Sequence, residues 1–146
     1  MLLQDFEKYP DKYLTEEDVR GFLVSILLKH SEFNTLQDTS DNSKSISLHS
    51  EVRWYGYSGK LKYRSDIVII DVASLKAKDG MFKLPSKGYS FNKPLAIIEI
   101  KLRRINGCSD DGFFKKIKKD INKLKKIKKE VQGDYFCCLV ILDKRG

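Results

Sequence analysis

Apolar residues recur at helical spacing in two separate stretches of the chain. In residues 13–30, YLTEEDVRGFLVSILLKH, they fall at three- and four-residue steps, which predicts an amphipathic helix. Thr15 followed by Asp18 resembles a capping box with aspartate in place of glutamate, so we expect the helix to begin there. In residues 109–131 a second apolar stripe predicts a long helix with its lysines outward. The members of that stripe are Phe114, Ile117, Ile121, Leu124, Ile127 and Val131.

Four further stretches have the patterns of strands, and they are residues 45–56, 62–72, 95–102 and 134–144. The first alternates, and the residues expected on its buried face are Ile46, Leu48, Val52 and Trp54. The second carries a continuous apolar run, typical of a central strand. The last is apolar throughout, so we expect it to be buried on both faces. Polar residues 34–45 and the long stretch 74–94 are expected to be loops, with a turn at Gly56 and Gly59.

The order of these elements predicts the fold class, which is α/β with an αβββαβ core. Three strands joined by loops form an antiparallel meander, and a strand reached through a helix is expected to run parallel to the third strand. Helices should then cover both faces of a central mixed sheet. At 146 residues the chain fits a single domain, residues 1–146.

The charge of the chain is concentrated in one segment. The formal net charge is +8, and the span from Lys115 to Lys129 contains nine lysines and one acid, Asp120. The remainder of the chain is balanced, with 19 basic and 19 acidic residues. Such a segment indicates a polyanionic partner, first nucleic acid and second an anionic membrane surface. A solvated helix face without a partner is the plain alternative.

Several classes of protein are disfavoured by the composition. No apolar run reaches the length of a membrane span, and the first residues do not resemble a secretion signal, so we expect a cytoplasmic protein that does not enter membranes. His30 and His49 lie far apart, which makes a zinc site improbable. The three cysteines form no CxxC pair, and we expect them to be reduced.

Charged residues interrupt two of the apolar strands. Glu99 and Lys101 lie on one face of their strand, roughly 7 Å apart. Asp66 interrupts the neighbouring strand in the same way, so it can converge with Glu99 if the two strands pair. Two neighbouring carboxylates are best tolerated with a cation between them, and oxygen ligands favour Mg²⁺, with Mn²⁺ as a substitute. Such an ion activates water for cleavage of a phosphodiester, and Lys101 would help to position that water.

These residues resemble the motif of the PD-(D/E)xK nuclease superfamily, which has the restriction-endonuclease-like fold. Asp66 precedes the apolar residues IVII, and Glu99-Ile100-Lys101 forms the E-x-K of the following strand, whereas Ser65 stands where the family has proline. The resemblance implies Asp66, Glu99 and the Ile100 carbonyl as metal ligands and Lys101 as the catalytic lysine. Many members add a glutamate from the first helix. Here that residue is expected to be Glu16, with Glu17 as the reserve.

The sequence thus predicts a Mg²⁺-dependent nuclease, in the first place a DNA endonuclease, with RNA left open as substrate. Phosphate contacts are expected from Arg103, Arg104, Lys115, Lys116 and Lys119. Small nucleases of this type often act as dimers, so a homodimer is one expected state. The first alternative is a catalytically inactive nuclease-fold domain that binds nucleic acid or protein. The second is an interaction protein whose basic helix docks on an acidic partner or an anionic bilayer.

Overall fold

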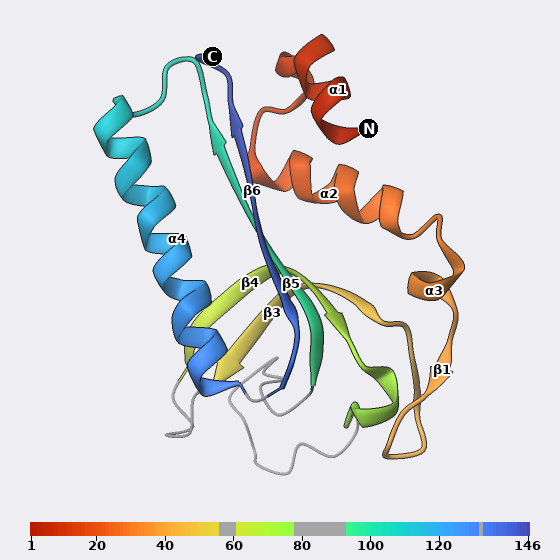
Figure 1. The fold of residues 1–146 in the computed structure, drawn as a ribbon. Coiled ribbons are helices and arrows are strands. Elements are labelled where there is room, and N and C mark those ends of the chain that lie inside the picture. Colours follow the sequence, from red (N-terminus) through yellow and green to blue (C-terminus); the bar gives the residue numbers. More distant parts are fainter. Residues whose placement is uncertain (56–60, 78–92, 132) are drawn as a thin grey trace.

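The computed structural model describes residues 1–55, 61–77, 93–131 and 133–146 (Figure 1). The helical elements are α1 (Leu2–Lys8), η1 (Pro10–Lys12), α2 (Glu16–Leu27), α3 (Ser31–Asn34), η2 (Val72–Ser74) and α4 (Asp110–Glu130). The strands are β1 (Gln37–Asp38), β2 (Lys44–Ser45), β3 (Leu48–Tyr55), β4 (Leu61–Ile70), β5 (Pro94–Arg103) and β6 (Phe136–Asp143). The turn predicted at Gly56 and Gly59 and most of the predicted loop 74–94 lie outside the described residues.

The central sheet has four strands in the order β3-β4-β5-β6. The pairs β3–β4 and β4–β5 are antiparallel, and α4 connects β5 to the parallel strand β6. The predicted meander and the parallel fourth strand are therefore confirmed, as is an α/β fold with a mixed sheet flanked by helices. The order α2, β3, β4, β5, α4, β6 follows the predicted helix and strand sequence.

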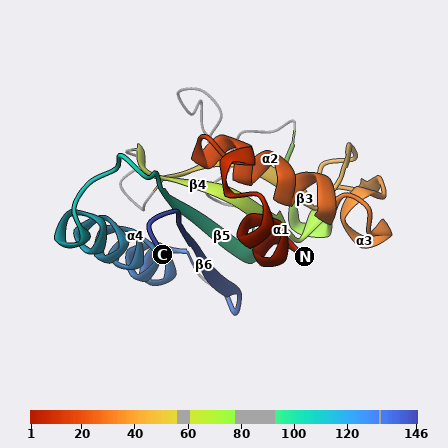
Figure 2. The same ribbon diagram turned by 90° about the horizontal axis from the view of Figure 1, so that it is seen from above.

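Each face of the sheet is covered by helices from a different part of the chain (Figures 1 and 2). On one face, Leu124 and Ile127 of α4 pack with residues such as Val68 and Ile97 of the sheet. The other face packs against α1 and α2; the core residues here include Phe6, Tyr13, Val19, Ile67 and Ile100. No helix in the described ranges is both long and apolar enough to span a bilayer.

The prediction of a plain loop over residues 34–45 is wrong. Strands β1 and β2 pair there as a short antiparallel hairpin. The Thr39 hydroxyl organises its turn, since it donates to Asp41 and accepts from the backbone N–H of Ser43 at 2.9 Å. Strands of two residues carry no readable apolar period, which is why the pattern gave no sign of them.

The predicted burial of two apolar elements, β6 and α4, is also wrong in part. Strand β6 is an edge strand rather than one buried on both faces, and its Phe136 is 67% exposed. In α4, Phe113 is buried whereas the predicted core residue Phe114 is 60% exposed. The inward stripe of α4 is thus displaced by one residue in its first half. Steps of four, three and four residues from Phe113 lead to Ile117, Asp120 and Leu124. Asp120 therefore lies on the side of the helix that faces the sheet.

The alternation predicted for β3 fails in the middle of the strand. Leu48 and Val52 were expected on one face, yet they belong to the cores on opposite sides of the sheet. Glu51, between them, has a left-handed backbone with φ of 58°, which is unfavourable for a residue with a side chain. The register leaves Glu51 opposite Asp66, because the flanking pairs are Ser50 with Ile67 and Val52 with Ser65. An irregular strand residue therefore lies beside the predicted site.

Candidate active site

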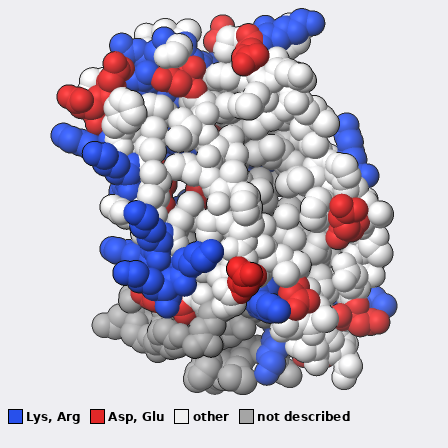
Figure 3. Space-filling view, in the orientation of Figure 1, with Lys and Arg blue, Asp and Glu red and all other residues white. Residues whose placement is uncertain are grey.

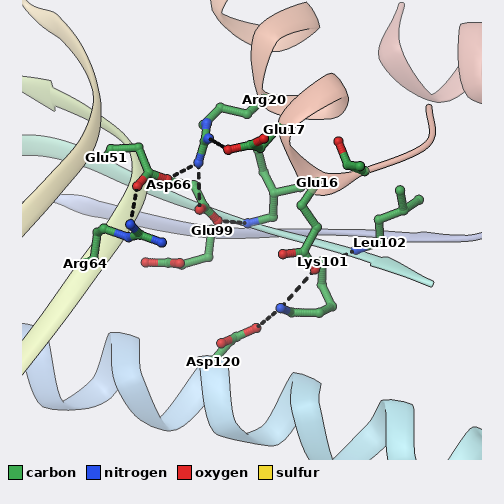
Figure 4. A network of polar contacts seen from close by, with 12 residues as sticks. Glu16, Glu17, Arg20, Glu51, Arg64, Asp66, Glu99, Lys101, Leu102 and Asp120 are labelled. Atoms are coloured by element: carbon green, nitrogen blue, oxygen red, sulfur yellow. Dashed lines mark hydrogen bonds and ion pairs between the residues drawn. The ribbon is translucent and has the colours of Figure 1, made fainter. Parts of the chain in front are cut away.

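The candidate site lies where β4 separates from β5. Pairing between the two strands ends at Ile67 with Ile98, whereas β5 continues to pair with β6 as far as Arg103. Beyond this point two acids accept hydrogen bonds from the edge of β5 that β4 no longer pairs with (Figure 4). Asp66 Oδ2 accepts the backbone N–H of Ile100 at 2.8 Å, and Glu16 Oε1 accepts that of Leu102 at 3.3 Å. The carboxylates thus replace the missing strand as hydrogen-bond acceptors.

The first turn of α2 delivers Glu16 to this edge. The predicted capping box is present, with Thr15 Oγ1 accepting the N–H of Asp18 at 3.2 Å and Asp18 Oδ2 accepting that of Thr15 at 2.8 Å. Glu16 is therefore the first residue of the helix and points at β5. Glu17 instead contacts Arg20 at 3.1 Å on the surface. Of the two glutamates left open by the sequence, Glu16 is the one that reaches the strand.

Asp66 and Glu99 are neighbours whose ion-pair partners come from opposite sides. Asp66 Oδ1 lies 3.5 Å from the guanidinium of Arg20 on α2. Glu99 Oε2 accepts a hydrogen bond from the ammonium of Lys123 on α4. Glu99 is only 2% exposed, and its second oxygen, Oε1, has no hydrogen-bond partner of good geometry in the described part of the chain. Oε1 is therefore the less satisfied oxygen of Glu99, and the Ser65 hydroxyl lies near enough to lower the pKa of this carboxyl.

The environment of Glu99 favours its protonated form more than water does. Burial raises the pKa of the Glu99 carboxyl to about 7, Lys123 opposes that shift, and the negative charge of Asp66 raises it further. The strand register places Asp66 opposite Glu99, one position beyond the pair of Ile67 with Ile98. A cation placed between them would offset the cost of burying the charge of Glu99 and the repulsion between the two carboxylates.

Lys101 is held between a helix on each side of the sheet. Its Nζ lies 3.0 Å from Glu16 Oε1 and 3.1 Å from Asp120 Oδ2 (Figure 4). Burial acts to lower the pKa of Lys101, but its contacts with Glu16 and Asp120 prevail and raise it. The ammonium group therefore stays charged and is fixed in direction by two carboxylates.

Two residues of α4 belong to the site although the sequence did not single them out. Asp120 pairs with Lys101, and Lys123 pairs with Glu99. Helix α4 thus presents an acid and a lysine three residues apart, opposite the acid and lysine two residues apart on β5. Asp120 had a signal, because it is the one acid in the lysine-rich segment.

Glu51 is a third residue that the sequence did not assign to the site. Its carboxylate bridges two arginines, one of them Arg64 of β4 at 2.7 Å and the other Arg20 of α2. Arg20 in turn contacts Asp66, so a chain of alternating charges runs from β3 to the candidate ligands (Figure 4). Its left-handed backbone explains why strand alternation did not reveal this position.

The acids and the adjacent carbonyl fit a hard divalent cation in their chemistry. Asp66 and Glu99 supply carboxylate oxygens, and the Ile100 carbonyl belongs to the same open edge of β5, because the N–H and C=O of one strand residue point to the same side. In the described ranges no group of three or more His, Cys, Asp or Glu side chains is arranged to hold a metal. Each acid instead pairs with an arginine or lysine of the chain. A cation would have to compete with these internal charges.

Lys and Arg side chains gather over α4 beside the site (Figure 3). A cleft of about 540 Å³ is lined by basic residues, which are Arg64, Lys115, Lys118, Lys119, Lys123 and Lys126. A second cleft of about 640 Å³ is lined by Glu16 and Lys101 and also by Arg104 and Lys116. Asp120 lines the first cleft, so the Glu16–Lys101–Asp120 contacts lie between the two.

Arg103 is held in place by contacts with both β6 and α4. It is 7% exposed, donates to both carboxylate oxygens of Asp143 and to Asp110, and stacks 4.9 Å from the ring centre of Phe113. The guanidinium thus connects β5 to β6 through Asp143 and to α4 through Asp110. The phosphate contact predicted for Arg103 stays a prediction: Arg103 lines the cleft of about 640 Å³, but its guanidinium is paired with two carboxylates, whereas Arg104 is exposed.

Comparison with protein-family models, curated proteins and solved structures gives no match to this chain. The resemblance to the nuclease superfamily therefore stays a prediction from the sequence.

Proposed function

We propose that this chain is a Mg²⁺-dependent nuclease of the PD-(D/E)xK type that hydrolyses phosphodiester bonds in DNA, with RNA as the alternative substrate. The observation that carries the proposal is that Asp66 and Glu99 lie opposite each other where β4 leaves β5, with Lys101 two residues further along β5 in contact with Glu16, beside two clefts lined by lysine and arginine. The restriction-endonuclease-like core is part of the proposal, and the helix and strand order of the sheet supports it.

Within this proposal Asp66, Glu99 and the Ile100 carbonyl hold the cation. The bound ion would supply charge neutralisation and an activated water, the usual contributions of Mg²⁺ to phosphodiester hydrolysis. Lys101 contributes a fixed positive charge close to the scissile phosphate, where negative charge grows in the transition state. Glu16 and Asp120 keep its ammonium in place. Arg104, Lys116 and the lysines of the other cleft bind the flanking phosphates.

A second candidate is a binding module with the same fold and no chemistry. It is favoured by the internal pairing of Asp66 with Arg20 and of Glu99 with Lys123, which leaves both acids neutralised. Both candidates predict nucleic-acid binding that weakens steeply with salt. Only the nuclease predicts strand cleavage.

The test is incubation of the protein with supercoiled plasmid and with single-stranded DNA and RNA, in Mg²⁺, Mn²⁺ or EDTA. The matched variant is Asp66→Asn, because its amide oxygen can still accept the N–H of Ile100 while the ligand charge is lost. Cleavage by the wild type in Mg²⁺ that EDTA and Asp66→Asn both abolish supports the nuclease. Retained binding without cleavage in either metal supports the binding module.

A further inference from the structure

Lys123 already places a cation on the buried carboxylate that the proposed metal would use. Its ammonium donates to Glu99 Oε2 and, at 2.9 Å, to the backbone carbonyl of Arg64. Glu99 has no other ion-pair partner in the described residues, and its Oε1 has no hydrogen-bond partner of good geometry there. The carboxylate is thus satisfied on one oxygen by an amine of the chain itself.

We propose that Lys123 is a positioning residue that occupies the cation position beside Glu99 in the metal-free protein, and that a divalent cation binds by displacing its ammonium group. This inference depends on the proposed use of Glu99 as a metal ligand. When Glu99 is ionised, the lysine neutralises the buried carboxylate until a metal takes over.

The position of Lys123 allows this exchange. Its side chain is 22% exposed and lines the cleft of about 540 Å³, so the ammonium can return to water when it leaves Glu99. Glu99, by contrast, is buried on a central strand and cannot follow it. The mobile partner of the ion pair is therefore the lysine, and the fixed partner is the proposed ligand.

Displacement has a consequence for the proposed substrate. A released Lys123 adds one positive charge to a cleft that already contains Arg64 and four other lysines. Metal binding would then strengthen phosphate binding in that cleft. Because such coupling is reciprocal, a polyanion in the cleft would strengthen metal binding by the same factor.

The first experiment measures the affinity of the folded protein for Mn²⁺ by electron paramagnetic resonance, without nucleic acid. Lys123→Gln removes the competing charge but keeps a hydrogen-bond donor for Glu99. Lys126→Gln is the matched control, because it removes the same charge from the same cleft and Lys126 has no contact with Glu99. If the Lys123 ion pair is closed about nine-tenths of the time, Lys123→Gln should bind Mn²⁺ about tenfold tighter than the wild type, and Lys126→Gln within about twofold of it.

Equal affinity of Lys123→Gln and the wild type would overturn the inference but leave the metal site standing. Absence of Mn²⁺ binding in all three proteins would overturn the inference together with the metal part of the proposed function. If Lys123→Gln does not fold, acylation of the wild type with a succinimidyl ester, read by mass spectrometry, decides. Mg²⁺ should then increase the labelling of Lys123 several-fold and leave Lys126 unchanged, and unchanged labelling of Lys123 would overturn the inference.

Discussion

Lys101 of β5 and Asp120 of α4 form an ion pair between sheet and helix, with 3.1 Å between Nζ and Oδ2. Both side chains are largely buried, and the same ammonium contacts Glu16 of α2. One lysine therefore connects the two helices that cover opposite faces of the sheet. This connection fixes the strand that carries Glu99 against the lysine-rich helix.

Removing the acid of that pair should destabilise the protein. We expect Asp120→Asn to lower the free energy of unfolding by about 1–3 kcal/mol, because Lys101 then has a single carboxylate for a largely buried charge. Asp134→Asn, at an exposed loop position, is the control and should change the free energy by less than about 0.5 kcal/mol. Urea denaturation measures both. Equal urea midpoints for Asp120→Asn and the wild type would show that the pair contributes no stability.

Arg103 should matter for folding. Arg103→Lys keeps the positive charge but cannot form the paired hydrogen bonds to Asp143 or stack as a plane on Phe113. We expect a loss of about 2 kcal/mol in the free energy of unfolding, with nucleic-acid affinity of the folded variant unchanged. Denaturation and a DNA-retention assay separate these effects. A stable variant that binds DNA poorly would instead support the phosphate contact of Arg103.

Arg104 should show the opposite behaviour. It is exposed and lines the cleft next to Lys101, so Arg104→Gln removes one phosphate contact without disturbing the core. The measured quantity is the slope of the logarithm of DNA affinity against the logarithm of salt concentration. In Arg104→Gln this slope should be less steep than in the wild type by about 1. The thermal midpoint should stay the same. An identical salt slope would show that Arg104 does not contact phosphate.

The raised pKa of Glu99 should make stability depend on pH. The folded protein holds the Glu99 proton up to a pH of about 7, whereas the unfolded chain loses it near the ordinary pKa of 4.5. Folded protein then binds more protons between these values, so stability falls as pH rises through this interval and levels off above it. The Glu99→Gln variant has no carboxyl group at this position, so this contribution to the pH dependence is absent from it. Between about pH 5 and pH 8 the wild type should lose about 2 kcal/mol more free energy of unfolding than Glu99→Gln. Parallel pH profiles of the two proteins would contradict this.

Much of the fold could be predicted because strong local patterns specify it. The capping box of Thr15 and Asp18 fixed the start of α2, and the apolar runs around Asp66 and Glu99 identified the two central strands. Crossover through a helix then implied a parallel fourth strand, since a short turn cannot make that connection. These are the features for which sequence pattern and packing agree.

Other parts of the site depended on differences of one residue or on backbone shape. Adjacent Phe113 and Phe114 allow two nearly equal stripes along α4, and only packing shows that Phe113, and with it Asp120, faces the sheet. Glu51 joins the site through a left-handed backbone that no residue pattern encodes, because such a φ is mostly a property of glycine. The edge position of β6 is a matter of topology, and an apolar strand looks the same at an edge as in the centre.

The most direct test of the central claim is the rate at which supercoiled plasmid is nicked in Mg²⁺ by Glu99→Gln and by Glu17→Gln. Both changes remove one carboxylate charge, but Glu17 is an exposed residue that pairs with Arg20, whereas Glu99 is the buried candidate ligand. We expect Glu99→Gln to lower the rate at least about 100-fold and Glu17→Gln to leave it within about twofold of the wild type. A Glu99→Gln protein that nicks plasmid as fast as the wild type would contradict the claim that Glu99 holds the metal.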